Sequence, residues 1–88
     1  MNKLRLKGIK ALIPVRVTKT KGVLAAKDPV GSIYEGTFTY NVLCGDPMRL
    51  IYAKARKWFL SSPVQSIAHG ETSTIVKTMH STYRVEAL

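Results

Sequence analysis

One cysteine and two histidines are the residues of this chain best suited to nucleophilic or proton-transfer chemistry. Cys44 stands just before Asp46-Pro47, a pair typical of a helix start, where the helix dipole favours a reactive thiolate. His69 or His80 could then act as its base. A free cysteine that ends an apolar strand is more commonly a small buried hydrophobe, so we expect Cys44 to be buried and chemically silent.

Motifs for metals and phosphates are missing from the sequence. Two histidines and five scattered acids give no HExxH motif and no paired carboxylates, and one cysteine cannot form a multi-thiolate site. The glycines between Gly31 and Gly36 match neither the GxGxxG spacing nor the Walker pattern. We therefore expect no enzymatic activity, no metal and no cofactor.

Charge is the most unusual property of the sequence. Fourteen Lys and Arg against five Asp and Glu give a formal net charge of +9. Residues 1–27 hold eight of these cations and no acid, whereas residues 28–88 carry a net charge of only +1. Such an excess favours an anionic partner.

The length of 88 residues predicts one modest core and a single domain over residues 1–88. No apolar run approaches the roughly 20 residues that a membrane span needs, and the single cysteine fits a reducing compartment. We expect a cytoplasmic protein. The acid-free, basic start also resembles an organellar presequence in composition.

The first predicted strand covers residues 4–17, where apolar residues alternate with period two and change parity at Gly8. A β-bulge at Gly8 would bring both apolar sets onto one face and the cations of the segment onto the other. An amphipathic helix through Leu6, Ile9 and Ile13 is the alternative. Pro14 and the β-branched residues after it favour the strand.

Residues 18–32 read as a turn or loop that could include a short edge strand over residues 23–26. A second strand is predicted over residues 32–43, with Tyr34, Phe38 and Tyr40 on its apolar face. These three rings resemble a stacking surface for single-stranded nucleic acid. Packing into the core is the simpler reading, and we expect it.

A helix is predicted over residues 47–60, because Asp46 can cap its free amides and Pro47 suits its first turn. A hairpin should follow, with strands at residues 64–68 and 73–87, the second with an apolar parity of Ile75, Met79, Tyr83 and Val85. The predicted fold class is α+β: an antiparallel sheet of about four strands, order ββαββ, with one helix on one face.

The predicted binding residues lie on two basic faces, one on the N-terminal strand and loop and the other on the helix. Those two faces would point in opposite directions. Either one of them is the site, or a loop, a homodimer or a wrapping polyanion joins them. The predicted binding residues are Lys3, Arg5, Lys7, Lys10, Arg16, Lys19, Lys21, Arg49, Arg56 and Lys57.

Three functions are compatible with these features. The first is a small non-enzymatic protein that binds DNA or RNA through phosphate contacts. The second is a protein-binding accessory or inhibitor module, for example a phage-type host-interaction or counter-defence protein that docks on an acidic surface. The third is an amphipathic N-terminal segment that lies on an anionic membrane.

Overall fold

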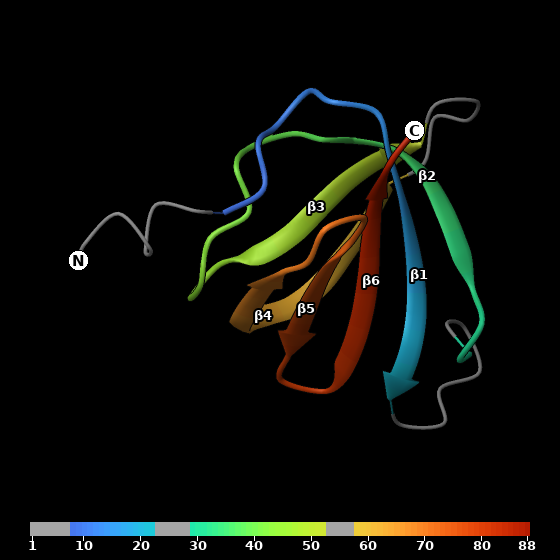
Figure 1. Cartoon of the computed structure of the whole chain (residues 1–88). Coiled ribbons are helices and arrows are strands. Elements are labelled where there is room, and N and C mark those ends of the chain that lie inside the picture. Colours follow the sequence, from blue (N-terminus) through green and yellow to red (C-terminus); the bar gives the residue numbers. More distant parts are fainter. Residues whose placement is uncertain (1–7, 23–28, 53–57) are drawn as a thin grey trace.

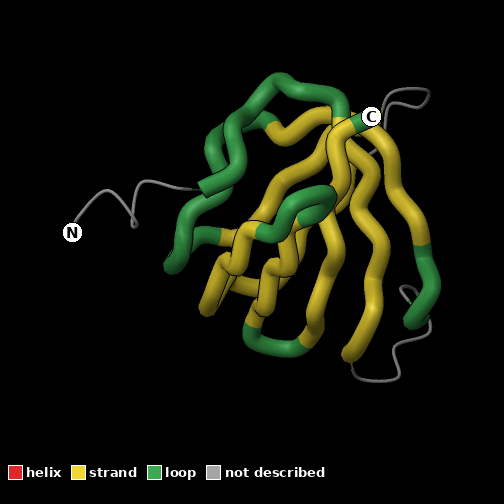
Figure 2. Tube along the Cα trace, in the orientation of Figure 1, coloured by secondary structure: helices red, strands yellow, loops and turns green. Residues whose placement is uncertain are grey.

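A computed structural model of the chain describes residues 8–22, 29–52 and 58–88. Six antiparallel strands, neighbours in chain order, close into a barrel (Figure 1). The described part consists of strands and loops only (Figure 2). The strands are β1 (Val15–Gly22), β2 (Ile33–Phe38), β3 (Pro47–Tyr52), β4 (Trp58–His69), β5 (Thr74–Thr78) and β6 (Ser81–Ala87).

The predicted α+β class is therefore wrong, and the predicted helix over residues 47–60 is the reason. Within this segment, residues 47–52 form β3 and residues 58–60 begin β4, while residues 53–57 lie outside the described residues. Leu50, which a helix would have turned toward solvent, is fully buried and pairs with Phe38 of β2 and Phe59 of β4. Long-range pairing on both sides of β3 overrides the local helix-start signal.

Asp46 belongs to a turn and not to a helix cap, and Pro47 begins β3. Gly45 has a φ of 99°, a left-handed conformation that glycine adopts without strain. The Asp46 carbonyl accepts a hydrogen bond from the Val64 amide at 3.0 Å, and the Gly45 amide donates to the Val64 carbonyl at 2.8 Å. The turn is thereby tied to β4 and starts β3 in register.

Strand β1 closes the barrel by pairing with β6 as well as with β2. Val15 and Val17 point into the core, and the strand runs on to Gly22 through residues predicted to form a loop. The predicted strand over residues 4–17 is wrong from residue 8 to residue 14, and residues 1–7, like the predicted edge strand at 23–26, lie outside the described residues. In Figure 1, β1 and β6 lie side by side.

Residues 8–14 form a loop that contacts the chain after β2. Ile9 and Val42 exchange two backbone hydrogen bonds of 3.0 and 2.8 Å. Gly8 is required here because a Cβ would overlap the Val42 carbonyl, so its role is close approach and not the predicted bulge. Leu12 has a φ of 67° and is 76% exposed.

The core combines aliphatic residues with one aromatic group. Tyr34 of β2 stacks on Phe59 of β4 at 4.7 Å between ring centroids and on Tyr52 at 5.7 Å, and Phe59 meets Tyr83 edge-on at 5.4 Å. Phe38 is fully buried. The predicted core packing of Tyr34 and Phe38 is confirmed, but that of Tyr40 is wrong, because Tyr40 is exposed and donates its hydroxyl to the Pro47 carbonyl.

Strand β4 pairs with β3 up to Pro63 and with β5 from Val64 onward, and both ladders shift register near this junction. The Ser61 hydroxyl accepts from the Met48 amide at 2.9 Å and donates to the Ser62 carbonyl. Ser62 in turn contacts the hydroxyl of Thr78 at 2.9 Å. These bonds satisfy polar groups that the irregular ladder leaves unpaired.

The C-terminal hairpin prediction is confirmed at its first turn and wrong at its second. Residues 70–73 connect β4 and β5 as expected, but Met79 and His80 form another turn, so residues 73–87 are two strands. The apolar parity changes at this turn, because Val76 is buried in β5 whereas Ile75 and Met79 are exposed.

Candidate functional site

Half of the predicted binding residues lie on or beside the barrel in the described part of the chain. The other five, Lys3, Arg5, Lys7, Arg56 and Lys57, fall outside the described residues. The described part carries seven Lys and Arg and four Asp and Glu, so most of the excess charge belongs to segments 1–7, 23–28 and 53–57 of the sequence.

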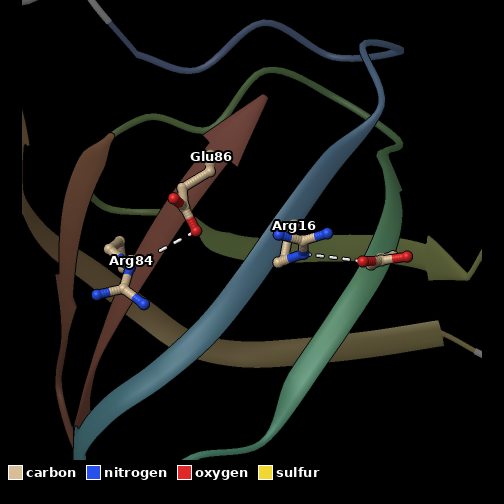
Figure 3. Close-up of polar contacts among 4 residues, drawn as sticks. Arg16, Arg84 and Glu86 are labelled. Atoms are coloured by element: carbon tan, nitrogen blue, oxygen red, sulfur yellow. Dashed lines mark hydrogen bonds and ion pairs between the residues drawn. The ribbon is translucent and has the colours of Figure 1, made fainter. Parts of the chain in front are cut away.

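Arg16 lies on the outer surface of β1 between two acids. It is opposite Glu35 of β2 and Glu86 of β6, and its Nε donates to the Glu35 carboxylate at 2.8 Å. On β6, Arg84 stands 3.6 Å from Glu86 (Figure 3). The outer surface formed by these four residues alternates in charge and is neutral, so Arg16 is not part of a free basic face.

Lys19 was predicted to bind a partner, but its side chain is inside the barrel. Only 2% of it is exposed, because it continues the inward parity of Val15 and Val17. It lies opposite Tyr83, and its terminal atoms pass over Gly22 beside Ser81. A partner on the barrel surface cannot reach it.

Lys10 and Lys21 are exposed, but they lie apart, Lys10 in the loop before β1 and Lys21 near the end of β1. Lys10 borders a hollow of about 110 Å³ that Gly8, Ile9, Asn41 and Leu43 also line. This volume holds only a few water molecules at roughly 30 Å³ each. Because Lys10 and Lys21 lie apart in different segments, the structure does not bring these two cations together into one site.

Arg49 of β3 differs from the other described arginines in its partner. Its guanidinium lies 3.8 Å from the ring centroid of Trp58 on β4, a cation–π contact. Within the described residues no carboxylate pairs with Arg49. An indole ring therefore positions this cation and leaves its charge unneutralised.

Trp58 and its neighbours form an apolar surface on the outside of the barrel. Ile51 is directly opposite Trp58 and Leu60 is directly opposite Arg49, all four pointing outward because Leu50 and Phe59 point inward. Ile51, Trp58 and Leu60 are 46, 56 and 58% exposed. We call Arg49, Ile51, Trp58 and Leu60 the β3–β4 face.

The Arg49 Nε and the hydroxyl of Thr39 are buried, and neither has a hydrogen-bond partner among the described residues. Thr39 is adjacent to Arg49, since its amide donates to the Arg49 carbonyl at 2.9 Å. Packing against Trp58 thus helps to hold a guanidinium whose Nε makes no hydrogen bond within the described residues.

Sequence reasoning found Arg49 and missed the other three residues, because the helix predicted over residues 47–60 would turn Ile51 and Trp58 toward the core, on the side opposite Arg49. Alternation does not reveal them, because apolar residues occupy consecutive positions at 50–52 and again at 58–60. Between these two runs the sequence carries Lys54, Arg56 and Lys57, so cations flank the exposed residues along the chain.

The residues with potential for catalysis are Cys44, His69 and His80. Cys44 is exposed in a turn, so its expected burial is wrong, and His69 contacts the Thr74 hydroxyl at 3.0 Å. Among the described residues no three His, Cys, Asp or Glu side chains gather as a metal site would require. That same part of the chain holds no helix of the length and apolar character needed to cross a membrane.

Comparison of the chain with protein-family models, with curated proteins and with solved structures finds no match. The inference of function therefore rests on the chain's own residues, and the β3–β4 face is the best-defined candidate surface among those described.

Proposed function

We propose that this protein is a non-enzymatic nucleic-acid-binding protein that contacts its ligand through the β3–β4 face. The stacking of Arg49 on the exposed ring of Trp58 carries this proposal. An exposed indole offers a π-face to a base, and an unneutralised guanidinium offers charge to a phosphate. Nucleic acid carries both bases and phosphates, so it offers a partner to the indole and to the guanidinium.

Charge on a larger scale supports the same ligand. The net charge of +9 attracts a polyanion, and three cations stand in the sequence between β3 and β4. The surface around Arg16 offers much less, because Glu35 and Glu86 neutralise it. The β3–β4 face therefore replaces the N-terminal strand as the centre of the proposed contact.

The test is binding of fluorescently labelled oligonucleotides, followed by anisotropy over a series of salt concentrations. We expect affinity to fall steeply with salt, with a log–log slope of about −0.9 per phosphate neutralised on duplex DNA. Arg49→Glu should weaken binding and reduce the magnitude of that slope by about one or more.

Lys77→Glu is the matched control, because Lys77 is an exposed cation on β5 and the substitution changes the net charge equally. Equal losses in the two variants would place the contact elsewhere. Absence of binding at low salt would exclude the function.

An acidic protein is the rival partner, since Trp, Arg and aliphatic residues also form protein interfaces. Purification of the protein from lysate with and without nuclease separates the two. Partners that disappear on nuclease treatment favour nucleic acid, whereas one acidic protein retained in stoichiometric amount by wild type and lost with Arg49→Glu favours the rival.

A further inference from the structure

We infer that the β3–β4 face selects single-stranded nucleic acid and that Trp58 stacks on an unpaired base. This inference rests on the proposed function and names its ligand class. It follows from which side of the indole ring is covered, what surrounds the ring, and which nucleic acids have a base face to offer.

One side of the Trp58 ring is covered by the Arg49 guanidinium, 3.8 Å from the ring centroid. The residue is nevertheless 56% exposed, so a large part of the indole remains open to a ligand. An aromatic ring held on one side by a cation loses little side-chain freedom when a base stacks on it. The structure thus presents a preordered stacking surface.

A base inside a duplex has both faces covered by its neighbours, whereas an unpaired base exposes a face to an aromatic side chain. Trp58 can therefore contact a base through its ring only where the nucleic acid is unpaired.

The neighbours of Trp58 extend the surface along the strands. Ile51 lies directly opposite it, and Leu60 follows two residues later on the same face. Both are about half exposed, and they offer apolar contact to sugars or to an adjacent base. The charge of Arg49 lies among them, where a flanking phosphate would complement it.

Trp58 is the single tryptophan of the chain, so its intrinsic fluorescence reports directly on this site. The experiment titrates the protein with oligothymidylate, oligouridylate and a blunt duplex, each roughly 16 nucleotides long, a length within the range that one small barrel occupies. We expect both single strands to quench Trp58 and to bind at least about tenfold more tightly than the duplex. The comparison of the two single strands separates DNA from RNA as the source.

Two substitutions separate stacking from apolar contact. Trp58→Phe keeps an aromatic face, whereas Trp58→Leu keeps apolar area but removes the aromatic face. Both variants lack the tryptophan, so their binding is measured by the anisotropy of labelled oligonucleotides, as is that of the wild type for this comparison. We expect Trp58→Leu to weaken single-strand binding by about 5- to 150-fold, the range that one base–aromatic stack accounts for, and Trp58→Phe to lose much less. Duplex binding should change little in either variant. Circular dichroism and urea unfolding establish that both variants fold.

The outcomes distinguish this inference from the proposed function. Equal affinity for single strands and duplex, with no effect of Trp58→Leu, would overturn single-strand selection and leave nucleic-acid binding standing. No binding of any oligonucleotide would overturn both. Concentration-dependent self-association in sedimentation equilibrium that Trp58→Leu abolishes would show that a second copy occupies the face, which also overturns the inference.

Discussion

Lys19 of β1 and Tyr83 of β6 lie directly opposite each other, and both side chains point into the barrel. The aliphatic stem of Lys19 continues the row of inward-pointing residues that Val15 and Val17 begin on β1. We predict that Lys19→Met, which conserves this volume, lowers the free energy of unfolding by clearly less than Lys19→Ala does. Lys19→Ala should cost roughly 2–4 kcal/mol, because it leaves a cavity.

Urea unfolding followed by circular dichroism measures both changes. If Lys19→Met destabilises the protein as much as Lys19→Ala does, the ammonium group and not the stem provides the stabilisation. Because the side chain is inside the barrel, neither substitution should alter oligonucleotide binding by the folded protein.

Gly36 of β2 lies directly against the backbone of β3. A Cβ there would overlap the carbonyl oxygen of Ile51, a backbone atom that cannot move without breaking the β2–β3 pairing. We predict that Gly36→Ala lowers the free energy of unfolding by roughly 3 kcal/mol or more. Gly70→Ala, in the exposed β4–β5 turn, should lose less than about 1 kcal/mol and serves as the control.

The contact between Arg49 and Trp58 should be measurable as a coupling energy in the absence of ligand. A double-mutant cycle with Arg49→Ala and Trp58→Ala should give about 0.5–1 kcal/mol, the usual range for an exposed cation–π pair. Unfolding must be followed by circular dichroism, since one variant lacks the tryptophan. A coupling energy near zero would mean that the ring does not hold the guanidinium in solution.

Leu12 combines a left-handed backbone with an exposed side chain, at a φ of 67° and 76% exposure. Asparagine tolerates this conformation better than leucine. Leu12→Asn should raise the midpoint of urea unfolding, with a gain of about 0.5–1 kcal/mol. Ile13→Asn, at a neighbouring exposed position with no such backbone, should give no gain.

Cys44 is exposed, so its thiol should react with Ellman's reagent in the folded protein. The amplitude without denaturant should equal that in concentrated urea. Reaction only after unfolding would show that the turn before β3 buries the thiol. Cys44→Ser should change stability by less than about 0.5 kcal/mol, as expected for a surface substitution.

Strand positions could be predicted where alternation was unambiguous. The strand predicted over residues 32–43 is confirmed over Ile33–Phe38 and wrong after it, where Val42 forms an isolated bridge, and the turn after His69 is where Gly70 indicated it. Residues 48–52 gave no such guidance, because Met48, Leu50, Ile51 and Tyr52 fit either a helix or a strand. The deciding fact, that Leu50 meets Phe38 and Phe59, depends on pairing across the barrel.

The candidate site was harder to predict because it depends on register. A tryptophan in an apolar segment is expected in the core, and only the pairing of Ile51 with Trp58 places both on the outer surface. Lys19 shows the reverse case. It continues the parity of Val15 and Val17, but residues 18–32 were predicted to form a loop, where strand parity does not apply, and lysine is most often exposed.

The pairing of β1 with β6 has a consequence for synthesis of the protein. Val15 is opposite Ala87, so β1, which is translated first among the six strands, can complete its pairing only after β6, the last, has been made. Until residues 81–87 leave the ribosome, β1 and β5 both lack a neighbour, and their open edges can pair with other chains. A nascent chain stalled before β6 is therefore the form of this protein most in need of a chaperone.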